Sequence, residues 1–267
     1  MSDRWPQLGV GIGYRRGLHE QIEKSNDIDF LEVVAEQFLG RTAELRALTG
    51  RLPIIPHCTE LSLLGTMRPD PEYLSALRLL CRIVEAPFVS DHFAVTRAPM
   101  IKVNHLCPPV LSDQALQTAA ANISMIQDFL GVPLVLENIT QLFSLAAEVD
   151  LSEYMNTLCG QTGCGLLLDL ENVAVNRANA TPAGTVEDLA AEHIAYLHVA
   201  GGESYEEIRL DSHSAGVSDE VWESMRLLSQ RIDIKGVLIE RDDNFRSGED
   251  PLDDVRTARR ILGGGAR

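Results

Sequence analysis

Residues 133–138 read PLVLEN, and residues 165–170 read GLLLDL. In each stretch an unbroken apolar run leads to a carboxylate. Apolar residues at consecutive rather than alternate positions are typical of a strand covered on both faces, as in a parallel sheet. Between the two runs lies a longer, more polar stretch with amphipathic character. The two runs and the stretch between them therefore predict a βαβ unit.

The same pattern recurs along the whole chain. Helix starts are indicated by Asp70 before a first-turn proline, by Ser112, by Ser218 and by Asp250, and Gly131 ends the helix that Ser112 begins. Strands alternating with helices predict a single-domain (β/α)8 TIM barrel over residues 1–267. An open doubly wound sheet is the alternative, but no glycine-rich fingerprint turn follows the first strand. The eight expected strands are residues 9–13, 29–34, 52–57, 87–92, 133–138, 165–170, 196–200 and 236–240.

Composition limits the classes of partner. A formal net charge of −16 argues against nucleic acid, because non-specific affinity for the phosphate backbone comes from Lys and Arg. No apolar run reaches the roughly 18 residues of a membrane helix, and the N-terminal residues do not resemble a signal peptide. We therefore expect a cytoplasmic protein without a membrane partner. The five cysteines form no C-x-x-C pair, which argues against a disulfide framework or a structural zinc site.

Ionisable side chains gather at the same end of successive expected strands. The carboxyl ends of barrel strands converge on one mouth, so these residues should meet in one cleft. Several carboxylates in a partly buried mouth would repel one another, and divalent metals relieve that repulsion. Imidazole and carboxylate suit zinc, iron or manganese equally. The residues concerned are His57, Asp91, His92, Glu137, Asn138, Asp169, Glu171, Asn172, His198 and Glu240, with Asp211 and His213 in the loop after the seventh strand.

Some polar residues near this mouth are candidates for substrate contact. His105 follows a short hairpin-like stretch after the fourth strand, and Gly201 and Gly202 form a backbone that a ligand can approach closely. Asn138 lies beside Glu137. Asp91 points away from His92 on an extended strand, so it either contacts substrate or supports a neighbouring loop.

With these residues in place, the chain resembles the multinuclear non-haem iron-dependent oxidative enzymes, which belong with the xylose-isomerase-like barrels. The resemblance extends from GVGIGYRRG at residue 9 to IERDD at residues 239–243. Its most specific parts are SDHF at 90–93, PLVLENIT at 133–140, GCGLLLDLENV at 163–173, LHVAGG at 197–202 and LDSHS at 210–214.

The resemblance implies three metal positions. His57, His92 and Glu137 would hold one ion, and Glu137 would bridge to a second ion held by Asp169, His198 and Glu240. Asn172, Asp211 and His213 would hold the third. It further implies that Glu137, Asp169 and Glu240 are the catalytic carboxylates. The chain departs from the common family pattern at Glu171, where many members have asparagine, and at Gly202, where many have histidine.

Family members oxidise cysteine or another residue in ribosomally made precursor peptides. The resemblance therefore implies two or three iron ions of mixed Fe²⁺/Fe³⁺ valence, O₂ as cosubstrate, a Cys-containing precursor peptide and a separate peptide-recruiting partner protein. Two other classes stay open from the residues alone. One is a divalent-metal isomerase or phosphodiesterase/endonuclease on the same barrel, and the other is a non-catalytic metal-binding or scaffold protein.

Overall fold

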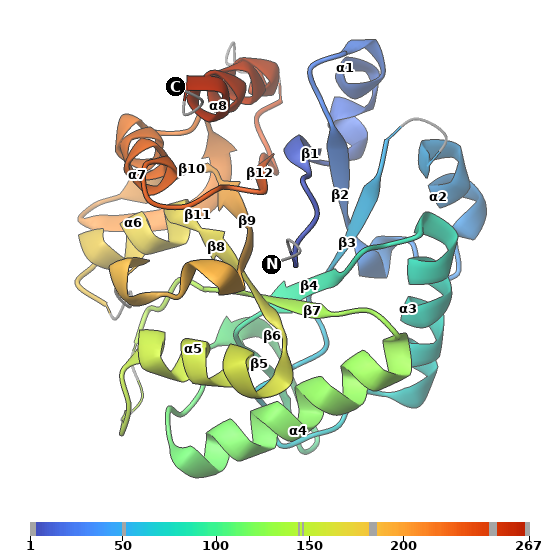
Figure 1. The fold of residues 1–267 in the computed structure, drawn as a ribbon, viewed down its shortest axis with the longest axis vertical. Coiled ribbons are helices and arrows are strands. Elements are labelled where there is room, and N and C mark those ends of the chain that lie inside the picture. The colour runs from blue at the N-terminus through green and yellow to red at the C-terminus, as the bar shows by residue number, and fades with distance from the viewer. Residues whose placement is uncertain are drawn as a thin grey trace.

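Eight parallel strands close into a barrel in the computed structural model, which describes residues 4–49, 52–143, 145, 147–181, 186–245 and 250–264 (Figure 1). The strand order around the barrel is β1-β12-β9-β8-β7-β4-β3-β2, and pairing of the first strand with the last closes it. This confirms the (β/α)8 barrel over the open sheet, whereas the domain limits 1–267 stay a prediction. The barrel strands are β1 Gly9–Gly13, β2 Phe30–Val34, β3 Ile54–Cys58, β4 Val89–His92, β7 Leu134–Glu137, β8 Gly165–Asp169, β9 Ile194–Val199 and β12 Gly236–Ile239.

The expected helix ends are confirmed. Asp70, Ser112 and Ser218 each accept a hydrogen bond from a backbone N–H of the first helical turn, and Asp250 accepts one from Leu252. Gly131 ends its helix in the left-handed conformation, with φ of 79°. The α-helices are α1 His19–Lys24, α2 Thr42–Thr49, α3 Pro71–Val84, α4 Asp113–Leu130, α5 Leu151–Thr162, α6 Leu170–Ala178, α7 Asp219–Ser229 and α8 Pro251–Gly264, and short 3₁₀ turns are η1 Arg16–Leu18, η2 Ala35–Gln37, η3 Val186–Asp188 and η4 Ala191–His193.

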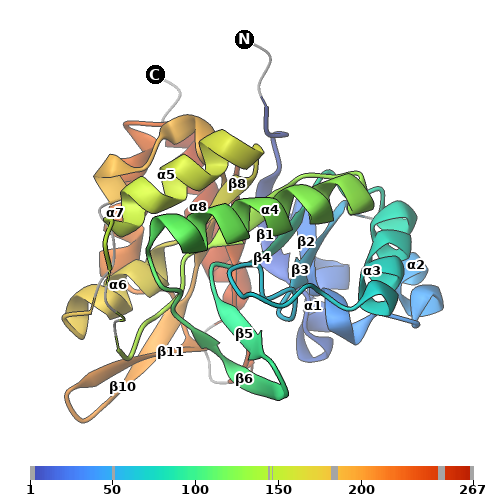
Figure 2. The same cartoon turned by 90° about the horizontal axis from the view of Figure 1, so that it is seen from below.

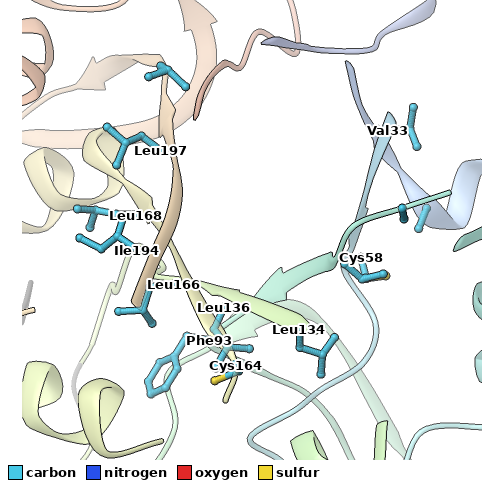
Figure 3. Packing of buried hydrophobic residues seen from close by; sticks show 14 of the residues in the cluster. Val33, Cys58, Phe93, Leu134, Leu136, Cys164, Leu166, Leu168, Ile194 and Leu197 are labelled. Atoms are coloured by element: carbon cyan, nitrogen blue, oxygen red, sulfur yellow. The ribbon is translucent and has the colours of Figure 1, made fainter. Parts of the chain in front are cut away.

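Side chains of most barrel strands alternate between two hydrophobic layers. One set, which includes Leu166 and Leu168 of β8, packs against the surrounding helices (Figure 3). The other set fills the barrel interior, and Trp5 packs against it. Because strand side chains repeat every second residue, the position two residues after an interior side chain faces the C-terminal mouth. The interior layer consists of Phe30, Ile55, Phe88, Val135, Leu167, Ala195, Tyr196 and Leu238.

Two antiparallel hairpins extend the strand-to-helix connections on the mouth side. They are β5 Val95–Ala98 with β6 Ile101–Cys107, and β10 Gly201–Tyr205 with β11 Ile208–Ala215. Figure 2 shows both projecting on the same side of the molecule. Two local expectations are corrected here. His105 lies on β6 itself rather than after the hairpin, and Asp211 and His213 lie on β11, in a stretch where its ladder with β10 is irregular. Cross-strand pairing, which short polar sequences signal weakly, explains both differences.

Among the described residues, no helix is both long and apolar enough to cross a bilayer. Cys81 and Cys159 are buried on α3 and α5.

Candidate metal centre

Strand register brings the expected residues together at the mouth. His92 of β4 lies directly beside Glu137 of β7, and Asp169 of β8 lies beside His198 of β9. His57, Glu137, Asp169 and His198 each follow an interior residue by two positions, so their side chains continue the interior layer upward to the mouth. The alternation of each strand therefore selects which side chains enter the site.

The first group consists of His57, His92 and Glu137. Both imidazole Nε2 atoms face the same carboxylate oxygen: His57 Nε2 is 3.5 Å and His92 Nε2 is 3.6 Å from Glu137 Oε2. Their ligand atoms all lie within 4.8 Å of one another. The three side chains are thus arranged to hold one cation between them.

The second group shares Glu137 through its other oxygen. His198 Nδ1 lies 3.4 Å from Glu137 Oε1, 3.1 Å from Glu240 Oε2 and 4.0 Å from Asp169 Oδ2. Asp169 uses Oδ1 to accept the backbone N–H of Asn172 at 2.7 Å, which caps α6 and leaves Oδ2 directed elsewhere. Glu137 therefore faces the first group with one oxygen and the second group with the other, as a bridging carboxylate would.

The third set lies at the edge of the mouth on α6 and β11. His213 Nε2 is 2.6 Å from Asp211 Oδ1, and its Nδ1 is 3.3 Å from Asp242 Oδ2. Asn172 is in the first turn of α6, three residues after Asp169. A further candidate group is formed by His213, Glu240 and Asp242. Asp242 was missed from the sequence because it belongs to a run of charges, which is typical of a solvated loop.

The donor set fits metal ions. In seven of the nine expected ligands a buried nitrogen or oxygen makes no hydrogen bond among the described residues, although several of these atoms face one another at ion-pair distance, as His213 Nε2 and Asp211 Oδ1 do. A buried polar atom without a hydrogen bond is unfavourable, so the concentration of such atoms in one mouth favours a ligand that satisfies them together. The atoms are His92 Nδ1, Glu137 Oε2, Asp169 Oδ2, Asn172 Oδ1, His198 Nδ1, Asp211 Oδ1 and His213 Nε2.

A buried network behind the ligands holds the imidazoles in place. Glu32 Oε2 lies 3.1 Å from His198 Nε2 and accepts the Tyr196 hydroxyl at 2.6 Å. Tyr196 also donates to Ser90 Oγ at 2.9 Å, and that oxygen lies 2.9 Å from His57 Nδ1. Metal-binding histidines characteristically use their second nitrogen in this way. The sequence contained one signal for Glu32, a carboxylate inside the apolar run of residues 29–34.

Without a bound cation, protonated imidazole would balance the charge of the carboxylates. Burial opposes the charged form of His92, but Glu137 and Asp91 outweigh it and raise the pKa of His92 to about 9. Burial likewise opposes ionisation of Glu137, yet His198 and His92 lower its pKa to about 2. For Asp169, burial and the neighbouring Glu137 raise the pKa well above the usual value. A divalent cation would take over the role of these protons.

Arg15 supplies a fixed positive charge at one edge of the site. Its Nη2 lies 3.0 Å from Glu240 Oε1, and its Nε donates to Asp242 Oδ1 at 2.6 Å. The guanidinium thereby occupies one side of the His213, Glu240 and Asp242 group. We accordingly take Asp242 as an orienting partner of His213 Nδ1, rather than as a ligand.

The residues expected to contact substrate fall into different environments. Asp91 is buried and accepts the backbone N–H groups of Leu61 and His92, which is consistent with the loop-supporting role. Asn138 is also buried, and its amide pairs with both backbone groups of Asp169, a candidate ligand. Both side chains are thus engaged with the protein itself.

His105 is exposed beside a cavity of about 440 Å³ that reaches His92 and is also lined by Thr59, Lys102 and Leu106. Gly201 and Gly202 lie instead against the protein's own backbone. A Cβ at Gly201 would lie 1.9 Å from the carbonyl oxygen of Gly216, and one at Gly202 would lie 2.1 Å from that of Leu210. The protein's own chain therefore fills the space that a side chain at either position would take, and substrate contact at these glycines stays a prediction.

Comparison with known proteins agrees with this architecture. Solved structures of similar fold include a xylose isomerase domain-containing protein from Salmonella typhimurium LT2, with a TM-score of 0.65 and 11% identity over 98% of this chain and 99% of that chain. The TTHB071 protein from Thermus thermophilus, soaked with ZnCl₂, has a TM-score of 0.62 and 18% identity over 97% of this chain and 100% of that chain. At these identities the likeness shows the fold alone.

Relatives identified by sequence share a higher identity with this chain than these solved structures do. A UPF0276 protein from Chromobacterium violaceum is 34% identical over 95% of this chain and 95% of its own length. Another, from Streptomyces avermitilis, is 35% identical over 89% of this chain, and the match spans only 52% of that longer protein. The model of the family described as RiPP precursor modification enzyme MbnB/TglH/ChrH, where RiPP denotes a ribosomally synthesised and post-translationally modified peptide, matches residues 9–263. The chain therefore belongs to the MbnB/TglH/ChrH family of RiPP precursor modification enzymes.

Proposed function

We propose that this protein is an O₂-dependent, multinuclear non-haem iron enzyme that oxidises a cysteine residue of a ribosomally made precursor peptide. The family membership over residues 9–263 supports an enzyme acting on precursor peptides. The observation that carries the metal part is the convergence on one barrel mouth of seven ligand residues, each with a buried polar atom that makes no hydrogen bond among the described residues.

The ligand chemistry supports iron. Among the described residues, none of the three candidate groups includes a cysteine, and all donors are imidazole nitrogen or carboxylate oxygen. Such donors accommodate both ferrous and ferric ions, so bound iron would supply electron transfer to O₂. We assign His57, His92 and Glu137 to one ion, and Glu137, Asp169, His198 and Glu240 to a second. The third set is Asn172, Asp211 and His213.

The protein's own residues would control where the substrate meets this centre. The cavity of about 440 Å³ beside His92 gives a route from the surface to the first ligand group, and His105 and Lys102 line it. A peptide cysteine entering there would reach the side of His92 that the fold leaves accessible. We therefore propose His105 as a substrate contact.

The three carboxylates have distinct parts in the proposal. Glu137 would keep two ions at a fixed separation, because its two oxygens face different imidazole groups. Asp169 is held by its cap to α6, so Oδ2 keeps one orientation. Glu240 is held by Arg15 through Oε1. These fixed oxygens would define the geometry in which O₂ accepts the electrons removed from the cysteine residue.

Recruitment and location complete the proposal. A separate peptide-binding partner protein would deliver the precursor, and the reaction would take place in the cytoplasm.

The test begins with the metal. The protein is reconstituted with Fe²⁺ without oxygen, desalted, and assayed for metal content and by electron paramagnetic resonance after partial oxidation. We expect two or more irons per chain and a mixed-valent signal. A candidate Cys-containing precursor peptide and its partner protein are then added with O₂, and mass spectrometry follows the peptide. Equal conversion without O₂, or full activity with Zn²⁺ alone, would refute the proposal and favour a Lewis-acid enzyme.

A further inference from the structure

Glu171 is a carboxylate with no exposed surface, situated on α6 between the proposed ligands Asp169 and Asn172. A buried carboxylate requires a partner of opposite charge. Arg209 of β11 supplies it in a two-pronged arrangement, in which Nε donates to Oε1 at 3.1 Å and Nη2 donates to Oε2 at 2.8 Å. This bidentate geometry is the strongest form of side-chain ion pair.

The ion pair is part of a wider attachment between β11 and the helices. The backbone N–H of Arg209 donates to Asn179 Oδ1 at 3.0 Å, and its carbonyl accepts from Asn179 Nδ2 at 2.8 Å. Arg209 Nη1 also donates to Glu220 of α7 at 2.7 Å. A single residue of the hairpin is therefore fixed to both ends of α6 and to the first turn of α7.

β11 also carries Asp211 and His213, two residues of the third set. They follow Arg209 by two and four residues on β11, in the irregular stretch between Leu210 and Ala215 where His213 has a left-handed φ of 48°. Asn172 is the immediate neighbour of Glu171 on α6. The pair of Glu171 with Arg209 thus joins the helix that bears one ligand of the third set to the strand that bears the other two.

The carboxylate of this pair lies next to Gly202 of β10. A Cβ on Gly202 would lie 2.8 Å from Glu171 Oε1, in addition to its clash with the backbone of Leu210. The two departures from the common family pattern, Glu171 and Gly202, are therefore linked in space. The buried carboxylate takes up room beside β10 that a side chain at 202 would need.

We infer that Glu171 and Arg209 form a positioning ion pair, the hairpin latch, which holds β10–β11 against α6 and so assembles the third metal position. The inference rests on the proposed function only in taking Asn172, Asp211 and His213 as ligands. Neither latch residue is itself a ligand in this assignment. Without the pair, β11 loses its charged anchor, and Asp211 and His213 lose their fixed distance from Asn172.

The experiment compares Arg209→Gln and the rescue variant Arg209→Lys with the wild type. The control is Arg226→Gln, which removes an exposed ion pair with Glu223 on α7, away from the hairpin. Hydrogen exchange of the metal-free proteins is measured over residues 201–215. We expect at least about a tenfold loss of protection there in Arg209→Gln, a partial recovery in Arg209→Lys, and no change in the barrel strands.

Metal content gives the second readout. After anaerobic loading with Fe²⁺ and desalting, Arg209→Gln should hold about one ion fewer per chain than the wild type, and Arg226→Gln the same number as the wild type. Unchanged exchange and unchanged metal content in Arg209→Gln would overturn the latch. If the wild type itself holds at most two ions, the third ligand set of the proposed function fails, whereas the exchange result still decides whether the latch anchors the hairpin.

Discussion

Replacement of Glu32 by glutamine tests how far the buried network controls the metal centre. Glu32 Oε2 alone serves two groups, the Tyr196 hydroxyl at 2.6 Å and His198 Nε2 at 3.1 Å. Glutamine has nearly the same shape but only one acceptor oxygen and no charge. Its carbonyl oxygen can take the position of Oε2 and still accept from both neighbours, so the variant removes the negative charge beside His198 and keeps the shape of the contact.

The expected magnitude follows from the position of this contact. His198 has no other oxygen partner at Nε2 among the described residues, and its Nδ1 faces the three carboxylates of the second group. Replacement of such an outer partner typically weakens metal binding by about 10–100-fold. That range corresponds to about 1.4–2.7 kcal/mol. We expect the barrel to fold, because glutamine preserves the packing volume.

The assay is competition for Fe²⁺ between the protein and a chromogenic chelator under anaerobic conditions. Glu36→Gln is the matched control, since Glu36 is a carboxylate of η2 that accepts from Thr59 N–H and the Tyr73 hydroxyl, on the far side of β3 from the imidazoles of the site. The reasoning is refuted if Glu32→Gln binds iron within about twofold of the wild type, or if both variants weaken equally.

Glu137→Ala should lose metal at both the first and second groups while the barrel still folds, because Glu137 contributes an oxygen to each group. Metal analysis and circular dichroism check this, and a normal metal stoichiometry would contradict the bridging assignment. The metal-free protein should lose up to about 3 kcal/mol of stability between pH 6.5 and 9 through His92, whose pKa is raised to about 9 in the folded protein. A raised pKa stabilises the folded state below the pKa of the unfolded state. That contribution disappears as the pH rises through the pKa of the folded state. Urea unfolding of chelator-treated protein at the two pH values measures this loss, and a stability that increases with pH in this window would show the site charge to be misassigned. The protein should not bind duplex DNA at physiological salt, given its net charge of −16; a sub-micromolar Kd that weakens steeply with salt would revive the endonuclease alternative.

The amino-acid sequence was sufficient for the barrel and for the location of its site. Continuous apolar runs such as residues 133–137 and 165–168 identify strands buried on both faces, and the alternation of side chains then decides which residues point inward. His57, Glu137, Asp169 and His198 each lie at the end of such a strand, so local periodicity together with barrel closure places them at one mouth. The helix caps at Asp70 and Ser112 are similarly local, because each is completed within three residues.

Only the tertiary structure decided the contacts that join distant parts of the chain. Glu32 meets His198 across 166 residues, and Arg15 meets Glu240 across 225. No local pattern specifies such pairs, since they depend on strand order around the closed barrel. The hairpin β10–β11 is a second case: the sequence indicated only a loop after the seventh strand, whereas its two strands pair antiparallel and Arg209 of β11 contacts Glu171 of α6. Sequence periodicity thus determined which side chains reach the mouth, and packing determined what each of them touches there.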